Sequence, residues 1–348
     1  MIFFKKVVLK FFLLTAFAFT SMQTSADESR EIKIFIAKDI LTLNLNNDSA
    51  EAVATQGSKI LNIGSQEELT SMYPNATLIS TYNNATIVPG FIEHHIHPFL
   101  AAVTMNFEIL AIEDWYLPSK TSKGVRDRLS YLSNLSEIEK NYPSNEPLIS
   151  WGFHHYFHGR LSKSDLDKIS STRPIIVIHR SFHEFILNTP AMELLGISKN
   201  AYSNLGEDEH LANFDDGHFS ERGAIIVLPN LMQVLAAPTK LMQGFQKTQE
   251  YLHRNGITVI GNPGSMYNKD LQAAKNLIFG NLDAPFESYF FPSALNISEQ
   301  FELNGVLDAA IEQTTWGAGK LNYLPKHIKL FTDGDVLSKH GYARWLYR

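Results

Sequence analysis

The chain has no cysteine among its 348 residues. Disulfide bonds and thiolate metal sites are therefore excluded. The absence does not decide the cellular compartment, because exported proteins without disulfides and proteins of other compartments both fit it.

Several catalytic motifs are missing as well. The sequence contains no Gly-x-Ser-x-Gly, no glycine-rich phosphate loop and no His-Glu-x-x-His, so serine nucleophiles and nucleotide binding have no support. The formal net charge is −6, and the charged residues are spread along the chain without a basic patch for nucleic acid. Small neutral or cationic partners remain open.

Residues 1–26 have the pattern of a secretory signal peptide. Lysines precede an apolar run at 11–19, and small residues at 24–26 suit cleavage. The apolar run is too short to span a bilayer comfortably, which favours cleavage over an uncleaved N-terminal anchor. We therefore expect an exported protein, periplasmic or secreted, with no stable membrane span after cleavage.

The rest of the chain changes pattern near residue 88. Before it, short strands and tight turns predict a small β unit, with a hairpin from Ala52–Ala54 to Lys59–Gly64 and a helix at Glu67–Tyr73. After Pro98, helices alternate with short apolar strands, which is the pattern of βα units with a parallel sheet. The other predicted strands are Thr77–Ser80, Thr86–Val88, Leu148–Gly152, Pro174–His179, Gly256–Ile260, Glu287–Phe291 and His327–Thr332, and the other predicted helices are Val125–Lys140, Thr189–Leu195, Lys240–Asn255, Lys269–Phe279 and Ser298–Leu307.

The most informative stretch is Val88–Pro98, Val-Pro-Gly-Phe-Ile-Glu-His-His-Ile-His-Pro. Because successive side chains on a strand point to opposite faces, His95 and His97 share one face and Ile96 takes the other. Two imidazoles then converge on one point, and Pro98 ends the regular pairing just beyond them. We predict a strand whose C-terminal end carries metal ligands.

This stretch resembles Pro-Gly-Phe-Ile-(Asp/Glu)-x-His-x-His-Pro, the signature of the amidohydrolase superfamily, and is similar to its third family, the YtcJ-like metal-dependent hydrolases. The resemblance implies an α/β fold in which a partial TIM-like (β/α) barrel, residues 89–348, follows the N-terminal part of a small β-sandwich unit, residues 27–88. A closed barrel needs about eight strands. Fewer are predicted between Gly90 and Arg348, so we expect an incomplete barrel in a truncated chain.

The resemblance also assigns Lys329, in Ile-Lys-Leu-Phe-Thr-Asp-Gly. Burying an unpaired charge is costly, so a lysine inside an apolar strand must lose its charge or find partners. In many amidohydrolases a lysine at this place is carboxylated by carbon dioxide and bridges two metal ions, which makes Lys329 a candidate metal ligand beside His95 and His97. The alternative is a lysine at a strand edge that reaches water. The following Asp333-Gly334 is expected to form a turn.

His183 is the candidate for substrate binding. It follows the predicted strand Pro174–His179 in a stretch similar to the family's Arg-Pro-Val strand and Asp-Gly-His, with Ser181-Phe182 in place of Asp-Gly. A histidine beyond a strand end is placed to contact a substrate carbonyl. A surface or core histidine is the alternative. Asn188 is expected to cap the next helix.

Three further stretches depart from the family pattern or leave two interpretations open. Glu221 is expected to be a solvated charge. Gly261 and Asn262 stand where the family has His-Asp, so no ligand or polar contact is predicted there. A group of aromatic and histidine residues after the strand Leu148–Gly152 either lines a substrate pocket or packs as a surface loop; its members are Trp151, His154, His155, Tyr156 and His158.

The resemblance implies metal-dependent hydrolysis of a carbon–nitrogen, non-peptide bond, such as a small-molecule amide, by metal-activated water. Nitrogen and carboxylate ligands without sulfur favour zinc, as one or two ions, with manganese, iron and nickel left open. No catalytic residue is identified. The family's general-base aspartate and two more histidines are expected beyond Arg348, so the chain alone is expected to be inactive.

The alternatives are a non-catalytic extracytoplasmic binding module on the same scaffold, and a metal-dependent isomerase or deaminase. The sequence predicts neither the identity of the substrate nor the oligomeric state.

Overall fold

The computed structural model describes residues 31–45, 47–143, 146–199, 210–235 and 237–330, and these divide into two compact units between Phe91 and Ile92. The predicted signal peptide, residues 1–26, lies outside the described residues. Within the described part of the chain, no helix combines the length and the apolar character needed to cross a membrane.

The first unit is a four-stranded sheet with one helix packed against it. Its strand order is β3-β2-β1-β4, with β1–β2 and β2–β3 antiparallel and β1–β4 parallel. Buried Ile34, Ala52 and Ala54 form an apolar cluster with Leu69 of the helix. The elements are β1 (Ile32–Asn44), β2 (Asn47–Gln56), β3 (Lys59–Gly64), α2 (Gln66–Met72) and β4 (Thr77–Ile87).

Local sequence signals explain most of this unit. Gly57 has a φ of +56°, which glycine adopts without strain, and it turns β2 into β3, so the predicted hairpin is confirmed. Ser65 accepts a hydrogen bond from the Glu68 N–H and begins α2, which confirms the predicted helix. The predicted strands Thr77–Ser80 and Thr86–Val88 are one strand, β4, because pairing with β1 continues between them.

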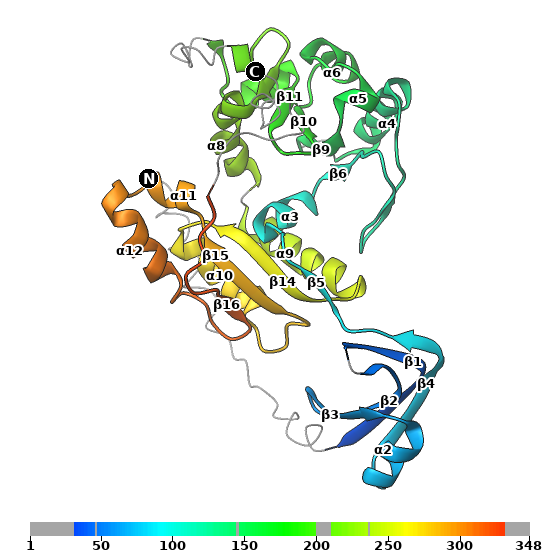
Figure 1. Cartoon of the computed structure of the whole chain (residues 1–348). Coiled ribbons are helices and arrows are strands. Elements are labelled where there is room, and N and C mark those ends of the chain that lie inside the picture. Colours follow the sequence, from blue (N-terminus) through cyan, green and yellow to red (C-terminus); the bar gives the residue numbers. More distant parts are fainter. Residues whose placement is uncertain (1–30, 46, 144–145, 200–209, 236, 331–348) are drawn as a thin grey trace, which may run out of the picture. The chain divides into compact units, whose positions relative to one another are not determined.

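The second unit contains two larger sheets and a small two-stranded one (Figure 1). The elements are β5 (Phe91–Glu93), α3 (Pro98–Thr104), β6 (Glu108–Ile109), β7 (Trp115–Tyr116), β8 (Thr121–Ser122), α4 (Arg128–Asn141), β9 (Leu148–Phe153), α5 (His155–His158), α6 (Lys163–Ile169), β10 (Ile175–His179), β11 (Glu184–Leu187), α7 (Thr189–Leu194), β12 (Ala212–Asn213), β13 (His218–Ser220), the 3₁₀ helix η3 (Glu221–Gly223), α8 (Ala224–Leu235), α9 (Pro238–Arg254), β14 (Ile257–Ser265), α10 (Lys269–Phe279), β15 (Glu287–Pro292), α11 (Ala294–Ser298), α12 (Leu303–Gln313) and β16 (Leu321–Tyr323).

The six-stranded sheet has the order β12-β13-β11-β10-β9-β6. Strands β6, β9 and β10 are parallel, and β11, β13 and β12 follow as antiparallel neighbours. Trp151, Ile178 and Phe185 belong to the apolar cluster on one face. Phe153 and Ile186 belong to the cluster on the other face. Because both faces are buried, β9 and β10 are continuous apolar runs.

The four-stranded sheet of this unit has the order β16-β15-β14-β5, with β14, β15 and β16 parallel. Helices α9 and α10 contribute Phe245 and Phe279 to its apolar cluster, together with Ile260, Phe290 and Leu321 from the strands. The His-x-His segment follows β5, so this sheet positions it.

The fold is mixed α/β, as predicted, but the described residues form no closed barrel. The predicted strand His327–Thr332 is wrong over its described part, where Lys329 alone pairs, in a single parallel bridge with Ser293. Lys326 has a φ of +63°, which turns the chain there. Leu330, the last described residue, is 66% exposed and is not packed in an apolar layer of the described part of the chain.

The predicted helix Ser298–Leu307 is correct only over Leu303–Leu307, the first residues of α12. Ser293 accepts a hydrogen bond from the Asn296 N–H and begins α11 early, and this helix ends at Ser298. The next helix, α12, begins only at Leu303.

A lysine is buried in the second unit. Lys275 of α10 is 1% exposed, its Nζ donates to Ser265 Oγ at 2.9 Å, and it lies 5.6 Å from the ring centre of Phe290. Burial lowers the pKa of Lys275 to about 7.

The stability of the protein should rise with pH above neutrality because of Lys275. Its folded pKa is about 7, and that of an unfolded lysine is about 10.4, so the unfolded chain binds more protons between these values. Lys275→Met should weaken this rise and stabilise the protein at neutral pH by about 1–4 kcal/mol. Urea unfolding across the interval measures both effects. Lys140→Met, at an exposed position, is the control, and a Lys275→Met protein that keeps the full rise would contradict the burial argument.

Asn188 confirms the predicted helix cap and does more than cap. Its Oδ1 accepts hydrogen bonds from the N–H groups of Ile175 at 2.8 Å and Ala191 at 3.0 Å. Its Nδ2 donates to the carbonyls of Ser170 and Arg173. The side chain is fully buried, so one amide joins β10, α7 and the chain after α6.

Asn188→Ala should therefore lower the free energy of unfolding by about 3 kcal/mol, since it removes a cap and leaves buried polar groups unpaired. Asp127→Ala removes the exposed cap of α4, and its expected cost is only about 1 kcal/mol. Chemical denaturation followed by tryptophan fluorescence compares them. Equal losses in the two variants would refute the joining role of Asn188.

Candidate metal centre

The His-x-His segment begins just beyond β5. The strand stops at Glu93, so the prediction that it runs through both histidines is wrong, but the backbone of His97 is extended, with φ −102° and ψ 91°. Ile96 packs against the apolar cluster of the four-stranded sheet. The ring centres of His95 and His97 lie 5.4 Å apart, with 86° between the ring planes. The two imidazoles therefore lie side by side.

Strand β14 approaches this segment so closely that a glycine is needed. The Ile96 N–H donates to the Gly261 carbonyl at 3.0 Å, and a Cβ on Gly261 would lie 2.8 Å from the His94 carbonyl oxygen. The next residue, Asn262, is 3% exposed, and its Oδ1 lies 3.3 Å from His97 Nδ1. The expectation of no polar contact at Asn262 is therefore wrong.

Lys329 reaches the same place from the chain after β16. Its backbone N–H donates to Pro292, and its carbonyl accepts from Ala294. A Cβ on Gly264 would lie 3.4 Å from Lys329 Cγ and 3.9 Å from His97 Cε1. The lysine side chain and the His97 ring therefore border one small space, which exists because residue 264 has no side chain. Asp333 lies outside the described residues.

The electrostatics of this space favour a neutral His97. Burial lowers the pKa of His97, the hydrogen bond with Asn262 raises it, and the positive charges of His95 and of nearby lysines lower it further. Neutral imidazole is the form that binds metal ions. The two imidazoles supply nitrogen donors that fit a divalent ion, whereas Lys329 fits only after losing its positive charge.

His183 lies between β10 and β11 of the six-stranded sheet, whereas His95 and His97 follow β5 of the four-stranded sheet. Its Nδ1 is 3.0 Å from Glu221 Oε2, and its carbonyl accepts from the Glu221 N–H at 2.8 Å. Only 14% of the Glu221 side chain is exposed, so the expectation of a solvated charge is wrong. The pair orients the half-exposed His183 ring, and its contact with a substrate stays a prediction.

The group of aromatic and histidine residues after β9 is divided between the two faces of the sheet. Trp151 belongs to the cluster on one face. His158 is buried against Tyr131 and Phe153 of the cluster on the other face. Its Nε2 donates to the Val125 carbonyl at 2.8 Å, and its Nδ1 accepts from the His154 N–H at 3.0 Å. Tyr156 is exposed. Because these residues lie on different sides of the sheet or face solvent, they do not line one shared pocket.

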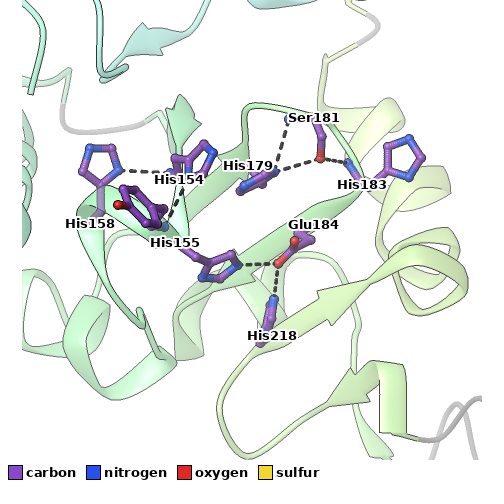
Figure 2. A network of polar contacts seen from close by, with 9 residues as sticks. His154, His155, His158, His179, Ser181, His183, Glu184 and His218 are labelled. Atoms are coloured by element: carbon purple, nitrogen blue, oxygen red, sulfur yellow. Dashed lines mark hydrogen bonds and ion pairs between the residues drawn. The ribbon is translucent and has the colours of Figure 1, made fainter. Parts of the chain in front are cut away.

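His155 makes a different contact. Its Nε2 lies 2.6 Å from Glu184 Oε2, and the same oxygen lies 2.8 Å from His218 Nε2 (Figure 2). One ligand atom from each residue lies within 4.8 Å of the others, which is close enough to hold one metal ion. Burial raises the pKa of Glu184, but the hydrogen bonds from both histidines outweigh it and hold this pKa well below its usual range.

Comparison with known proteins decides the family. The sequence profile described as "Amidohydrolase family" matches residues 83–348, which is most of the chain. The chain belongs to the amidohydrolase family. The resemblance inferred from the His-x-His stretch is therefore confirmed.

Two relatives of this amidohydrolase are similar to it over part of their length. "Exoenzymes regulatory protein AepA" of Pectobacterium carotovorum subsp. carotovorum is 23% identical over 311 residues, which cover 87% of this chain and 63% of that protein. "N-substituted formamide deformylase" of Arthrobacter pascens is 25% identical over 178 residues, which cover 49% of this chain and 30% of that protein. The matched regions thus span less than two thirds of each relative.

A solved structure is similar to this amidohydrolase in fold. It is an uncharacterized metal-dependent hydrolase from Pyrococcus horikoshii ot3, with a TM-score of 0.57 at 13% sequence identity, covering 88% of this chain and 55% of that one. At this identity the likeness shows the fold alone.

Sequence reasoning on this amidohydrolase missed Glu184 and His218 as well as Asn262. Glu184 stands directly before the apolar Phe185-Ile186-Leu187, and a carboxylate at the start of a buried strand is a usable signal of a paired charge. His218 follows Gly217, where a Cβ would collide with the Leu187 carbonyl. Gly217 thus lets the chain lie close to β11 directly before His218.

Gly264→Ala should fill the space between His97 and Lys329 and strain a backbone with a φ of +107°. We expect a loss of about 1–3 kcal/mol in stability, together with reduced zinc content. Gly196→Ala is the matched control, because its φ is +63° but its added Cβ would meet nothing within 4 Å. Zinc analysis and urea unfolding separate the two effects, and equal zinc content in both variants would contradict the crowding.

Proposed function

We propose that this amidohydrolase is a metal-dependent enzyme that hydrolyses carbon–nitrogen bonds other than peptide bonds, such as amides of small molecules. The observation that carries the proposal is the meeting of His97 and Lys329 at Gly264, with the His95 ring beside that of His97. Membership of the amidohydrolase family supports it. In this proposal the second unit is part of a TIM-like (β/α) barrel, and the first unit is part of a β-sandwich.

His95 and His97 would hold one divalent ion, for which we propose zinc. The Asn262 oxygen accepts from His97, so Nδ1 carries the proton and Nε2 is left for an ion. A bound ion supplies Lewis acidity, since it lowers the pKa of water towards about 7 and polarises a carbonyl group. His183, oriented by Glu221, would contact the substrate.

Lys329 would complete the centre after carboxylation. Its neutral amine adds to carbon dioxide, which forms a nitrogen–carbon bond, releases one proton and leaves a negatively charged carbamate. A carbamate oxygen, unlike an ammonium group, is able to bind a divalent ion.

The proposed substrates are small amides. The relative from Arthrobacter pascens is named as a deformylase of N-substituted formamides, and we propose the same class of bond for this protein. The pattern of residues 1–26 supports export to the periplasm or the medium.

Zinc affinity and hydrolysis test the proposal. The product of the complete open reading frame, loaded with zinc, should hydrolyse N-substituted formamides or related amides. His95→Ala and His97→Ala should each weaken zinc binding by more than about 100-fold, because even partners behind metal ligands contribute about 10- to 100-fold. His94→Ala is the matched control, since His94 is exposed and its ring is no part of the pair.

Equal loss of zinc in His94→Ala and His95→Ala would contradict the proposed centre. Intact zinc binding at His95 and His97 without turnover of any amide would instead favour a non-catalytic binding module on the same scaffold.

A further inference from the structure

Three side chains converge on one face of the six-stranded sheet, although they are far apart in the sequence. In the antiparallel pairing of β11 and β13, Glu184 lies opposite Ser220, and Ile186 lies opposite His218. Side chains alternate along each strand, so Glu184, Ile186 and His218 share one face of the sheet. His155 reaches Glu184 from α5, the short helix after β9.

The contacts of this group meet at one carboxylate oxygen. Figure 2 shows the rings of His155 and His218 pointing to Glu184 from different directions, and each places its Nε2 within hydrogen-bond distance of Oε2. The Glu184 side chain is 7% exposed, whereas those of His155 and His218 are 39% and 32% exposed. The group is therefore buried at the carboxylate and open to solvent at the histidines.

Packing holds the His155 ring in place. The ring stacks on His179, with centres 5.4 Å apart and 23° between planes, and meets Phe153 edge-to-face at 5.0 Å. His179 is itself 1% exposed, and its Nδ1 lies 2.8 Å from Ser181 Oγ. A ring that is oriented before a ligand arrives loses less conformational freedom on binding.

We propose that His155, Glu184 and His218 form a binding site for one divalent ion of the zinc class. Two imidazole nitrogens and one carboxylate oxygen are a set that zinc takes in sites with three protein ligands, which keep a fourth position for water. The ligand atoms lie within 4.8 Å of one another, and those of one tetrahedral zinc ion lie about 3.3 Å apart. Only small side-chain shifts are needed when the ion replaces the hydrogen-bonded protons.

This site shares no residue with the proposed centre at His95 and His97, which belongs to the other large sheet. It stands or falls independently of the hydrolase proposal. An ion here joins α5 to β11 and β13, so it stabilises this part of the six-stranded sheet.

Zinc binding by the purified protein tests the site. In a His95→Ala/His97→Ala background, we expect the protein to retain one equivalent of zinc, measured by mass spectrometry after gel filtration and by calorimetric titration. Adding Glu184→Gln, which keeps the shape of the side chain, should weaken this binding by more than about 100-fold. Adding His218→Ala should do the same. His253→Ala, at an exposed position in the last turn of α9, is the matched control and should change nothing.

If the His95→Ala/His97→Ala variant keeps its melting temperature but binds no zinc, this site is overturned. The centre at His95 and His97 is not affected by that result. Undiminished zinc affinity after Glu184→Gln would overturn the site at Glu184 as well. If the variants fail to fold, hydrogen–deuterium exchange of the unmodified protein with and without zinc decides. Slower exchange in α5, β11 and β13 supports the site, and unchanged exchange there refutes it.

Discussion

The close contact between β14 and the chain after β5 is the constraint on which the candidate metal centre depends. The hydrogen bond from Ile96 to Gly261 sets the register, and it forms because residue 261 has no Cβ to meet the His94 carbonyl. This register puts Asn262 against the His97 ring. Further along β14, the missing side chain at residue 264 leaves the space beside that ring. In our proposal β14 gives no metal ligand, yet it decides where a ligand points.

The two histidine groups differ in the charges around them. Burial lowers the pKa of His97 and the neighbouring positive charges lower it further, so its surroundings disfavour a positive charge on this ring. At Glu184, burial raises the pKa of the carboxyl, and hydrogen bonds from two histidines lower it further than burial raises it. That group already contains the anion that a cation requires. The two histidine groups thus differ in their neighbouring charges, which are positive around His97 and negative at Glu184.

Local patterns predicted those parts of the fold and site whose signals lie within one element. The strands Leu148–Gly152 and Pro174–His179 are continuous apolar runs because both their faces are buried, and their positions were predicted to within a residue. His95 and His97 are only two residues apart, so their closeness was predictable from the sequence although the strand ends before them. Glu184 and His218 are 34 residues apart and meet only through the register of β11 and β13, which no local pattern shows. The segment around Lys329 has the composition of a strand, but β16 already covers β15 from Ser288 to Phe290, so among the described residues only Lys329 pairs beyond it, with Ser293.

Because β11 pairs with β13, the positions of their side chains do not depend on the length of the chain between these two strands. The Leu187 N–H donates to the Gly217 carbonyl, so the chain that leaves β11 returns to the same point before His218. Lengthening a loop whose ends are already joined costs only about 0.6 kcal/mol for each doubling of its length. Evolution can therefore insert or delete residues between α7 and β12 while the spacing between Glu184 and His218 is preserved. We expect the variation in length among family members to concentrate in this segment.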